Sequence, residues 1–121
     1  IKLKKILITG AIGQDGCLLS QLYLKRKFKV FGFIKKNHKK KIKGVHYKIN
    51  DLTSFQKIFN DIKKIKPDII IHLASFNMSF SSRKKSSSYR IDYLQNLQTT
   101  KNLVNAILKN NLYVRFIFAG S

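Results

Sequence analysis

The sequence predicts a doubly wound α/β domain, in which a parallel sheet carries helices on both of its faces. Five short apolar runs lack the polar alternation of half-exposed strands, as is typical of strands buried in a parallel sheet. These runs are residues 4–9, 29–34, 45–49, 68–73 and 114–119. Segments with apolar residues at helical spacing separate most of them. Strands that alternate with helices favour a parallel sheet covered on both sides.

Three helices are predicted, over residues 16–27, 55–65 and 89–109, because apolar side chains recur there with the helical period. Pro67 ends the second helix, and residues 51–54 offer side chains that can cap its start. In the first helix the apolar positions are Leu18, Leu19, Leu22 and Tyr23. In the second they are Phe55, Ile58, Phe59, Ile62 and Ile65. In the third we expect the inward residues to be Leu94, Leu97, Leu103, Val104, Ile107 and Leu108.

The charge balance is strongly basic, with 25 Lys and Arg against 5 Asp and Glu and a formal net charge of +20. Such a balance raises the hypothesis of a nucleic acid or another anionic partner. The other interpretation is a compositional drift that places lysine at any tolerant surface position. The lysines are scattered, and only residues 35–43 form a dense run. We therefore favour the drift and expect no nucleic-acid partner.

The length of 121 residues suits one domain, which we place at residues 1–121. No apolar run reaches the length of a bilayer span, so no membrane association is expected. The single cysteine, Cys17, permits no internal disulfide, which is typical of a reducing cytoplasm. No metal site is predicted. Because the chain begins with Ile1 and stops at Ser121 directly after a strand, we expect a piece of a longer polypeptide.

A glycine-rich turn follows the first predicted strand and precedes the first predicted helix. Gly10 suits the tight turn out of the strand, and Gly13 would let the backbone approach a pyrophosphate. Gly16 allows the helix to pack closely on the strand. The start of the helix then offers free N–H groups and a partial positive charge to the phosphates. A glycine trio between a strand and a helix predicts a dinucleotide site.

The Gly-x-x-Gly-x-x-Gly spacing resembles that of the extended short-chain dehydrogenase/reductases, also called the NAD-dependent epimerase/dehydratase family. The pair Gln14-Asp15 between the glycines most resembles the sequence usual at this position in the GDP-mannose 4,6-dehydratase branch. The resemblance implies a Rossmann-like sheet with the strand order 3-2-1-4-5. It also implies that residues beside the turn, Thr9, Gly10, Gly13, Gln14, Asp15 and Gly16, contact the cofactor.

The end of the second strand bears on which cofactor binds. An acidic residue there would bind the ribose hydroxyls of NAD, whereas basic residues would hold the 2′-phosphate of NADP. The chain has Lys35 and Lys36 and no acid, similar to a pair of arginines in the dehydratase pattern. A charge-assisted bond is worth roughly 1.5–3 kcal/mol, which is about a tenfold to hundredfold preference. We expect NADP rather than NAD.

Further segments extend the resemblance along the chain. Residues 50–53 resemble the segment beside the cofactor adenine, where Asp51 and Leu52 are the implied contacts and Asp51 could instead cap the next helix. Residues 71–75 resemble the segment beside the cofactor ribose, with contacts from Leu73, Ala74 and Ser75. His72 within it is expected to be a packed strand residue. In the helix 96–107, Asn96 is expected to be a buried polar anchor, and Thr100 matches the family pattern.

Ser121 takes the position of the catalytic hydroxyl by the same resemblance, since it follows the strand that delivers this group in the family. The family's catalytic Tyr-x-x-x-Lys would lie beyond residue 121. Tyr23 and Lys27 have the same spacing, but we reject them because Tyr23 falls on the apolar stripe of the first helix. Residues 76–88, predicted as a loop, depart from the family pattern, so the sugar is less well defined than the cofactor.

The activity implied for the whole protein is the dehydration of GDP-mannose to GDP-4-keto-6-deoxymannose with bound NADP, by a homo-oligomer. The 121-residue chain alone is expected to bind cofactor at best. Two alternatives stay open. One is a nucleotide-sugar epimerase or a 4-keto-sugar reductase. The other, from a different class, is a basic nucleic-acid-binding module, which would need aromatic side chains interleaved with its charges.

Overall fold

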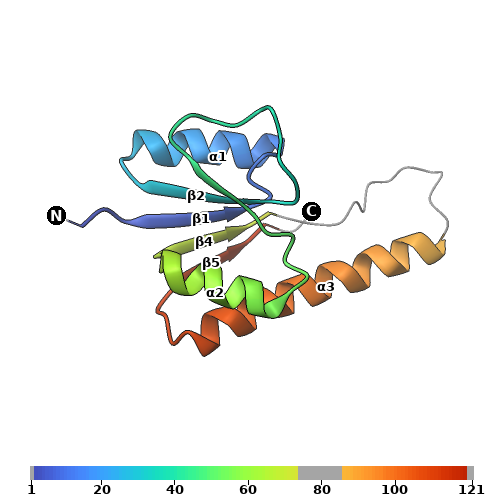
Figure 1. Cartoon of the computed structure of the whole chain (residues 1–121). Helices are drawn as coiled ribbons and strands as arrows, with labels where there is room; N and C mark the ends of the chain where they lie inside the picture. Colours follow the sequence, from blue (N-terminus) through green and yellow to red (C-terminus); the bar gives the residue numbers. More distant parts are fainter. Residues whose placement is uncertain (1, 74–85, 120–121) are drawn as a thin grey trace.

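The computed structural model describes residues 2–73 and 86–119, which form one parallel sheet with helices on both faces (Figure 1). The strand order is β3-β2-β1-β4-β5, which confirms the predicted order. The strands are β1 (Lys5–Thr9), β2 (Lys29–Ile34), β3 (His46–Ile49), β4 (Ile69–His72) and β5 (Arg115–Phe118). Each lies within one or two residues of the apolar run that predicted it.

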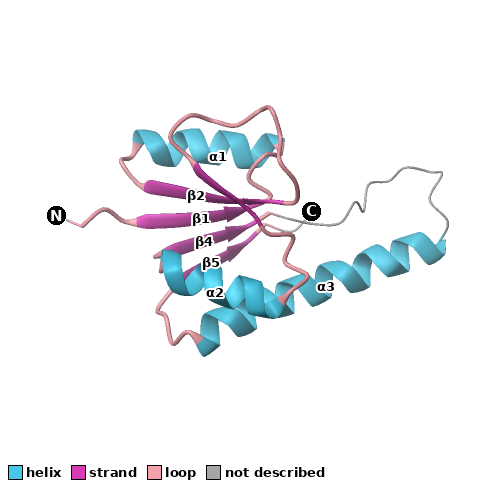
Figure 2. Cartoon of the chain, viewed as in Figure 1, coloured by secondary structure: helices cyan, strands magenta, loops and turns pink. Residues whose placement is uncertain are grey.

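Three helices connect the strands, with α1 on one face of the sheet and α2 and α3 on the other (Figure 2). Their bounds are α1 (Gln14–Lys25), α2 (Phe55–Ile65) and α3 (Ser86–Lys109). The helix that follows β1 in sequence, α1, lies on one face, and the helix that follows β4, α3, lies on the opposite face. Because Thr9 of β1 pairs with Phe33 of β2 and His72 of β4, these three strands end at the same edge. In doubly wound sheets the crevice at such a point is where ligands bind.

Each face of the sheet has its own apolar core. The core under α2 and α3 is built around Leu7, Phe33, Leu52, Ile58, Ile62, Ile65, Ile70, Leu103, Ala106 and Ile107. The core under α1 is built around Ile6, Ile8, Ala11, Val30, Ile34 and Ile71. Alternate residues of β1 therefore enter opposite cores, as expected for a strand covered on both sides.

The boundaries of α2 follow from local chemistry. The hydroxyl of Ser54 accepts a hydrogen bond from the backbone N–H of Lys57 at 3.3 Å and so caps the start of the helix. Lys66 closes the end in the left-handed conformation, with φ of 52°, directly before Pro67. Its stripe is buried at Ile58, Ile62 and Ile65, as predicted. Ser54, and not Asp51, is therefore the residue that caps this helix.

The predictions for α3 were partly wrong. The helix begins at Ser86, three residues before the predicted start, so residues 86–88 are not loop. Leu103 and Ile107 are buried as predicted, but the other four inward candidates, Leu94, Leu97, Val104 and Leu108, are exposed. The stripe that meets α2 and the sheet is narrow and includes the polar Thr99 and Asn102. Periodicity alone missed this because buried polar residues need hydrogen-bond partners that only the fold supplies.

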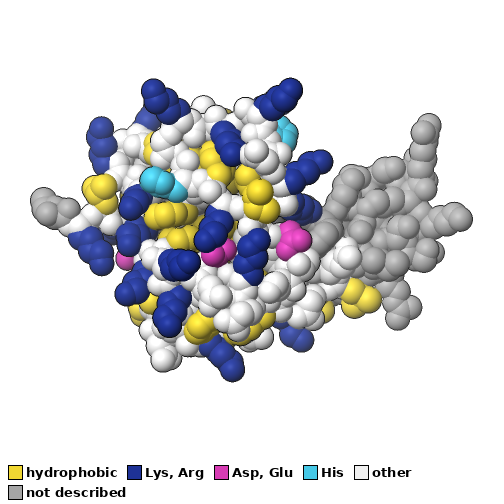
Figure 3. Space-filling model, viewed as in Figure 1, with side chains coloured by type: hydrophobic (Ala, Val, Ile, Leu, Met, Phe, Trp, Pro, Cys, Tyr) yellow, Lys and Arg dark blue, Asp and Glu magenta, His cyan; other side chains and the backbone are white. Residues whose placement is uncertain are grey.

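The basic side chains do not gather in a single patch on the face of the molecule that Figure 3 shows. Figure 3 shows Lys and Arg side chains spread over this face among neutral and apolar residues. The partly buried aromatic residues Phe55, Phe59 and Phe116 pack against the core. Phe31 packs there too, with the ammonium group of Lys29 5.5 Å from the centre of its ring. Within the described part of the chain, no helix combines the length and the apolar character that a membrane span requires.

Candidate functional site

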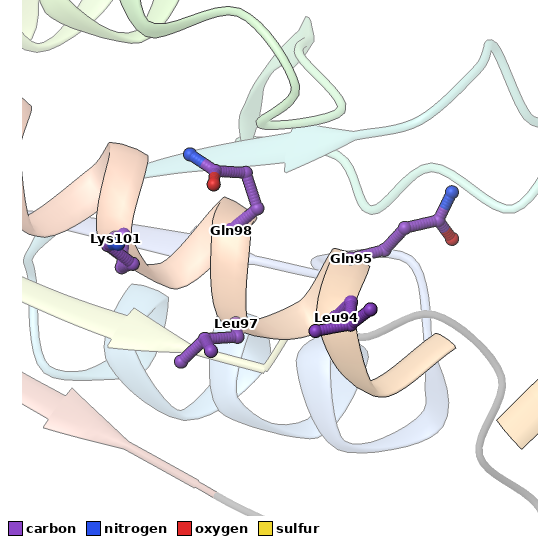
Figure 4. A pocket seen from close by; sticks show the side chains of 5 residues that line it. All are labelled: Leu94, Gln95, Leu97, Gln98 and Lys101. Atoms are coloured by element: carbon purple, nitrogen blue, oxygen red, sulfur yellow. The ribbon is translucent and has the colours of Figure 1, made fainter. Parts of the chain in front are cut away.

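A cavity of about 350 Å³ lies at the carboxyl ends of β1 and β2, beside the glycine turn. It is lined by Gly10, Ile12, Gly13, Phe33, Ile34, Lys35, Lys36, His38, Asn50, Asp51 and Leu73. Another hollow, of about 380 Å³, lies on α3 (Figure 4). Leu94 and Leu97 extend to one side of the helix there, and Gln95 and Gln98 to the other. Of the described elements, α3 alone lines that hollow, so the cavity beside the turn is the candidate site.

The glycine turn is held in place by backbone bonds. Gly10 has φ of 65°, which favours glycine, and its carbonyl accepts a bond from the N–H of Gly13 at 3.2 Å. The N–H of Ala11 donates to the carbonyl of Phe33 at 3.3 Å and ties the turn to β2. A Cβ on Gly32 of β2 would lie 2.6 Å from that of Ala11, so this glycine, which the motif did not include, also makes room for the turn.

Gly13 and Gly16 answer to different constraints. A Cβ on Gly16 would lie 2.3 Å from the carbonyl oxygen of Gly10, so the contact between α1 and the turn excludes any side chain there. Among the residues that the structure describes, a Cβ on Gly13 would meet only that same oxygen, at an ordinary 3.5 Å, and the φ of Gly13 is −68°. Neither packing nor backbone conformation therefore requires glycine at residue 13. A side chain at this position would instead project into space beside the cavity.

Within the described residues, no side chain caps the N-terminus of α1 and accepts from its first N–H groups. Gly13 is the N-cap and can supply no side-chain acceptor, and the first helical bond runs from the N–H of Cys17 to the carbonyl of Gly13. Gln14 and Asp15 lie exposed on this first turn. Unpaired N–H groups and the helix dipole together favour an anion at such a position.

Opposite walls of the cavity differ in charge. Lys35, Lys36 and His38 follow β2, whereas Asn50 and Asp51 follow β3. The carboxylate of Asp51 accepts bonds from the hydroxyl of Thr53 at 2.6 Å and from its backbone N–H at 3.1 Å. These bonds hold the pKa of Asp51 below its ordinary value. Asp51 therefore stays charged and can accept a hydrogen bond from a ligand.

Buried polar contacts support the Asn50 side of the cavity. The Asn50 amide donates to the buried carboxylate of Asp61 at 2.9 Å, and its carbonyl oxygen accepts from the N–H of Leu52 at 3.0 Å. Lys48 pairs with the other oxygen of Asp61 at 2.7 Å. On α3, the amide of Asn102 donates to the carbonyl of Leu52 at 3.0 Å. Leu52 needs this support because its φ of 66° is unusual for a residue other than glycine.

A second buried network joins β1, β4 and α3. Thr100 donates its hydroxyl proton to the carbonyl of Asn96 at 2.8 Å, so its oxygen must accept from Nε2 of His72, 3.1 Å away. The imidazole Nδ1 then accepts from the hydroxyl of Thr9 at 2.6 Å, and that hydroxyl accepts from the N–H of Leu73 at 2.9 Å. His72 is thus a buried, neutral strand residue, as expected. The network fixes Thr9 directly before the glycine turn.

The structure brings six of the predicted cofactor contacts together around the cavity: Gly10, Gly13, Lys35, Lys36, Asp51 and Leu73. Thr9 and Gly16 lie buried behind the turn and shape it. Leu52 is 1% exposed, so its side chain belongs to the core and does not line the cavity. The predicted contacts Ala74 and Ser75 and the predicted catalytic Ser121 lie outside the described residues.

Several residues of the site and its support were missed from the sequence. Asn96, the expected buried anchor of α3, is only half-buried. The amide of α3 that is buried is that of Asn102. No motif in the sequence identifies Asp61 or Lys48. The one available signal is that Asp61 is a charged residue beside the apolar stripe of an amphipathic helix. His38 sits in the basic run, where only the path of the loop shows which side chains reach the cavity.

A parallel sheet in the order 3-2-1-4-5, with a glycine turn and a cavity where the strand order reverses, defines a Rossmann-like domain. A family comparison agrees with this class. The model of the NAD dependent epimerase/dehydratase family matches residues 6–121, and the chain belongs to this family.

Solved structures of longer proteins resemble the chain. The Bordetella bronchiseptica enzyme WbmH in complex with NAD+ is 26% identical with a TM-score of 0.72, over 92% of this chain and 37% of that one. The UDP-Glc/GlcNAc 4-epimerase of Campylobacter jejuni is 25% identical with a TM-score of 0.74, over 95% and 36%. L-threonine dehydrogenase of Clostridium difficile is 25% identical with a TM-score of 0.78, over 100% and 37%. The chain thus spans little more than a third of the length of these structures.

The buried imidazole of His72 makes stability depend on pH. Burial lowers the pKa of His72 from 6.5 to about 4, so the unfolded chain binds the proton more readily than the folded chain. The contribution of His72 to stability should be constant above pH 6.5 and fall as the pH drops from 6.5 to 4, by up to about 3 kcal/mol.

Urea unfolding across this pH range should show the loss of stability in the wild type and a flatter profile in His72→Asn. His46→Asn, at an exposed histidine, should keep the wild-type slope. An unchanged slope in His72→Asn would show that His72 does not titrate as described.

Proposed function

We propose that this chain is the dinucleotide-binding part of an enzyme that acts on a nucleotide sugar, with NADP as its cofactor. The observation that carries the proposal is Gly13. Glycine at residue 13 is explained neither by its φ of −68° nor by the 3.5 Å contact that a Cβ would make, but it is explained by the close approach of a ligand.

The residues around the cavity fit a dinucleotide. The pyrophosphate would lie over Gly13 at the start of α1, where helix N–H groups face it. The adenine would lie between the ends of β2 and β3, where the Asp51 carboxylate can accept from its amino group. Leu73, with Ala74 and Ser75 after it, would border the ribose next to the nicotinamide. When bound, such a cofactor supplies hydride acceptance and return. The described residues bind and orient it.

Lys35 and Lys36 support NADP over NAD. Both line the cavity, and no acidic side chain from β2 lines it beside them. A phosphate monoester carries close to two negative charges at neutral pH, whereas a ribose hydroxyl carries none. Two ammonium groups therefore favour the phosphorylated cofactor. Lysine meets the phosphate as a point charge rather than with the planar fork of arginine.

For the whole protein we favour the dehydration of GDP-mannose to GDP-4-keto-6-deoxymannose. Support comes from Gln14 and Asp15, which match the sequence motif of the dehydratase branch and lie exposed on the first turn of α1. In this proposal Ser121 supplies the hydroxyl that hydrogen-bonds the reacting sugar oxygen. The catalytic Tyr and Lys would follow residue 121. The assembled enzyme would be a cytoplasmic homo-oligomer.

A nucleotide-sugar epimerase is the second candidate. It is favoured by the similarity to the Campylobacter jejuni UDP-Glc/GlcNAc 4-epimerase, at 25% identity. The similarity to L-threonine dehydrogenase, also at 25%, shows that this part of the fold occurs with unrelated substrates. The substrate therefore has to be tested on the whole protein.

The two glycines of the turn should separate stability from binding. Gly13→Ala should leave the melting temperature close to that of the wild type and weaken NADP binding by tenfold or more, because the new methyl group projects toward the pyrophosphate. Gly16→Ala should lower stability by about 1–3 kcal/mol, because its Cβ would lie 2.3 Å from a backbone oxygen. Thermal melts and NADP titrations of both variants measure this. Undiminished NADP binding by Gly13→Ala would remove the main support for the proposed site.

The lysine pair should determine cofactor choice. Replacing Lys35 and Lys36 together by Ala should weaken NADP binding roughly tenfold to hundredfold and leave NAD binding nearly unchanged. The control replaces Lys63 and Lys64 of α2 by Ala, which removes the same charge away from the cavity. Isothermal titration with both cofactors gives the ratio. Equal losses of NADP binding in the two double variants would mean that net charge, and not this pair, attracts the cofactor.

The substrate class should follow from the whole protein with NADP or NAD supplied. GDP-mannose should be converted to a 4-keto-6-deoxy sugar nucleotide, detected by mass spectrometry as loss of water. Epimerisation of a UDP-sugar without loss of water would instead establish the second candidate. RNA bound more tightly than NADP, with a steep salt dependence, would favour the nucleic-acid-binding alternative.

A further inference from the structure

His38 lines the candidate site together with Lys35 and Lys36, although no motif identifies it. It lies in the loop between β2 and β3, which is fastened to the sheet near its far end. There the N–H of Ile42 donates to the hydroxyl of Tyr47 at 2.9 Å, and the ammonium group of Lys41 lies 6.0 Å from the centre of the Tyr47 ring. The loop is therefore held against β3 while its first half borders the cavity.

Two contacts hold His38, and the one made by its ring fixes the tautomer. Its own N–H donates to the side-chain oxygen of Asn37 at 3.1 Å. The N–H of Lys40 donates to Nδ1 of the His38 ring at 3.0 Å. Because Nδ1 accepts a bond, the neutral ring carries its proton on Nε2. Nε2–H is therefore the donating end of this side chain.

In the part of the chain that the structure describes, the charged groups that line the cavity with His38 are Lys35, Lys36 and Asp51. The two ammonium groups attract an anion but impose little direction on it. Asp51 is already bonded to the hydroxyl and the N–H of Thr53. A ring N–H adds a directional donor to the basic wall, and such a bond is stronger to a charged phosphate oxygen than to a neutral hydroxyl.

We propose that His38 is a specificity-determining residue of the cofactor site, donating from Nε2 to the 2′-phosphate of NADP. This inference rests on the proposed function. In it, the Nε2–H of His38 is a directional donor beside the two lysine ammonium groups. It predicts that selectivity depends on the shape of the loop as well as on the number of positive charges.

The test compares NADP and NAD affinities of the protein and two variants at residue 38. His38→Phe keeps the ring and removes the donor, so NADP binding should weaken roughly tenfold while NAD binding stays unchanged. His38→Gln places an amide N–H near the position of Nε2 and should recover part of the NADP preference. His46→Phe, at an exposed histidine that does not line the cavity, is the control and should bind both cofactors as the wild type does.

The outcomes separate this inference from the proposed function. An NADP preference that survives His38→Phe would overturn the role of His38 and leave the lysine proposal standing. Equal weakening of NADP and NAD binding would mean that His38 only shapes the loop, which also overturns it. A wild-type protein that binds both cofactors equally would overturn the NADP proposal itself. Nitrogen-15 NMR of the His38 ring should show the proton on Nε2, and a proton on Nδ1 would contradict the geometry.

Discussion

The close contact between α1 and the turn that precedes it is the constraint on which the candidate site depends. Gly16 lets the helix backbone rest against the carbonyl groups of Gly10 and Ala11, where a Cβ would lie 2.3 Å from the nearest oxygen. The contact aims the N-terminus of α1 at the edge where β1 and β2 end. The same turn is tied to β2 through Ala11, and Gly32 leaves room for it. The cavity lies where these strands, the helix and the turn meet, with Gly10 and Gly13 among the residues that line it.

Buried polar contacts, rather than apolar packing alone, hold the remaining walls. One set links Lys48, Asp61 and Asn50 beneath the Asp51 side, and Asn102 holds the backbone of Leu52. The other links Thr9, His72 and Thr100 from β1 through β4 to α3. A buried polar group without a partner costs free energy comparable to a lost hydrogen bond. Each set therefore favours one arrangement of the loops that border the cavity, and so couples the core to the site.

The strong positive charge acts on the site mainly through position. Lysines occur over much of the surface, yet of the lysines in the described part of the chain only Lys35 and Lys36 line the cavity. A dispersed charge raises the general attraction for anions, whereas a cavity with a helix N-terminus and a directional donor can select among them. In the proposed function, this distinction would let a chain with a net charge of +20 favour a dinucleotide over an extended nucleic acid.

The sequence by itself determined the architecture and the location of the turn. Apolar runs such as 68–73 need burial on both faces, and Gly10 and Gly16 permit the positive φ and the close helix contact of the turn between β1 and α1. These are local constraints, which short stretches of sequence record. The strand order followed from the family resemblance and was confirmed.

Only the tertiary structure decided which side chains face the cavity and which residues support it. Leu52 was expected at the cofactor, but a left-handed backbone turns its side chain into the core. Leu94 was expected on the face of α3 that meets the core, but it is exposed. Asn102 is buried there instead, because the carbonyl of Leu52 accepts a hydrogen bond from its amide. His38 lines the cavity because the loop between β2 and β3 brings it beside Lys35 and Lys36. These outcomes depend on contacts between residues far apart in the chain, which periodicity and motif spacing do not encode.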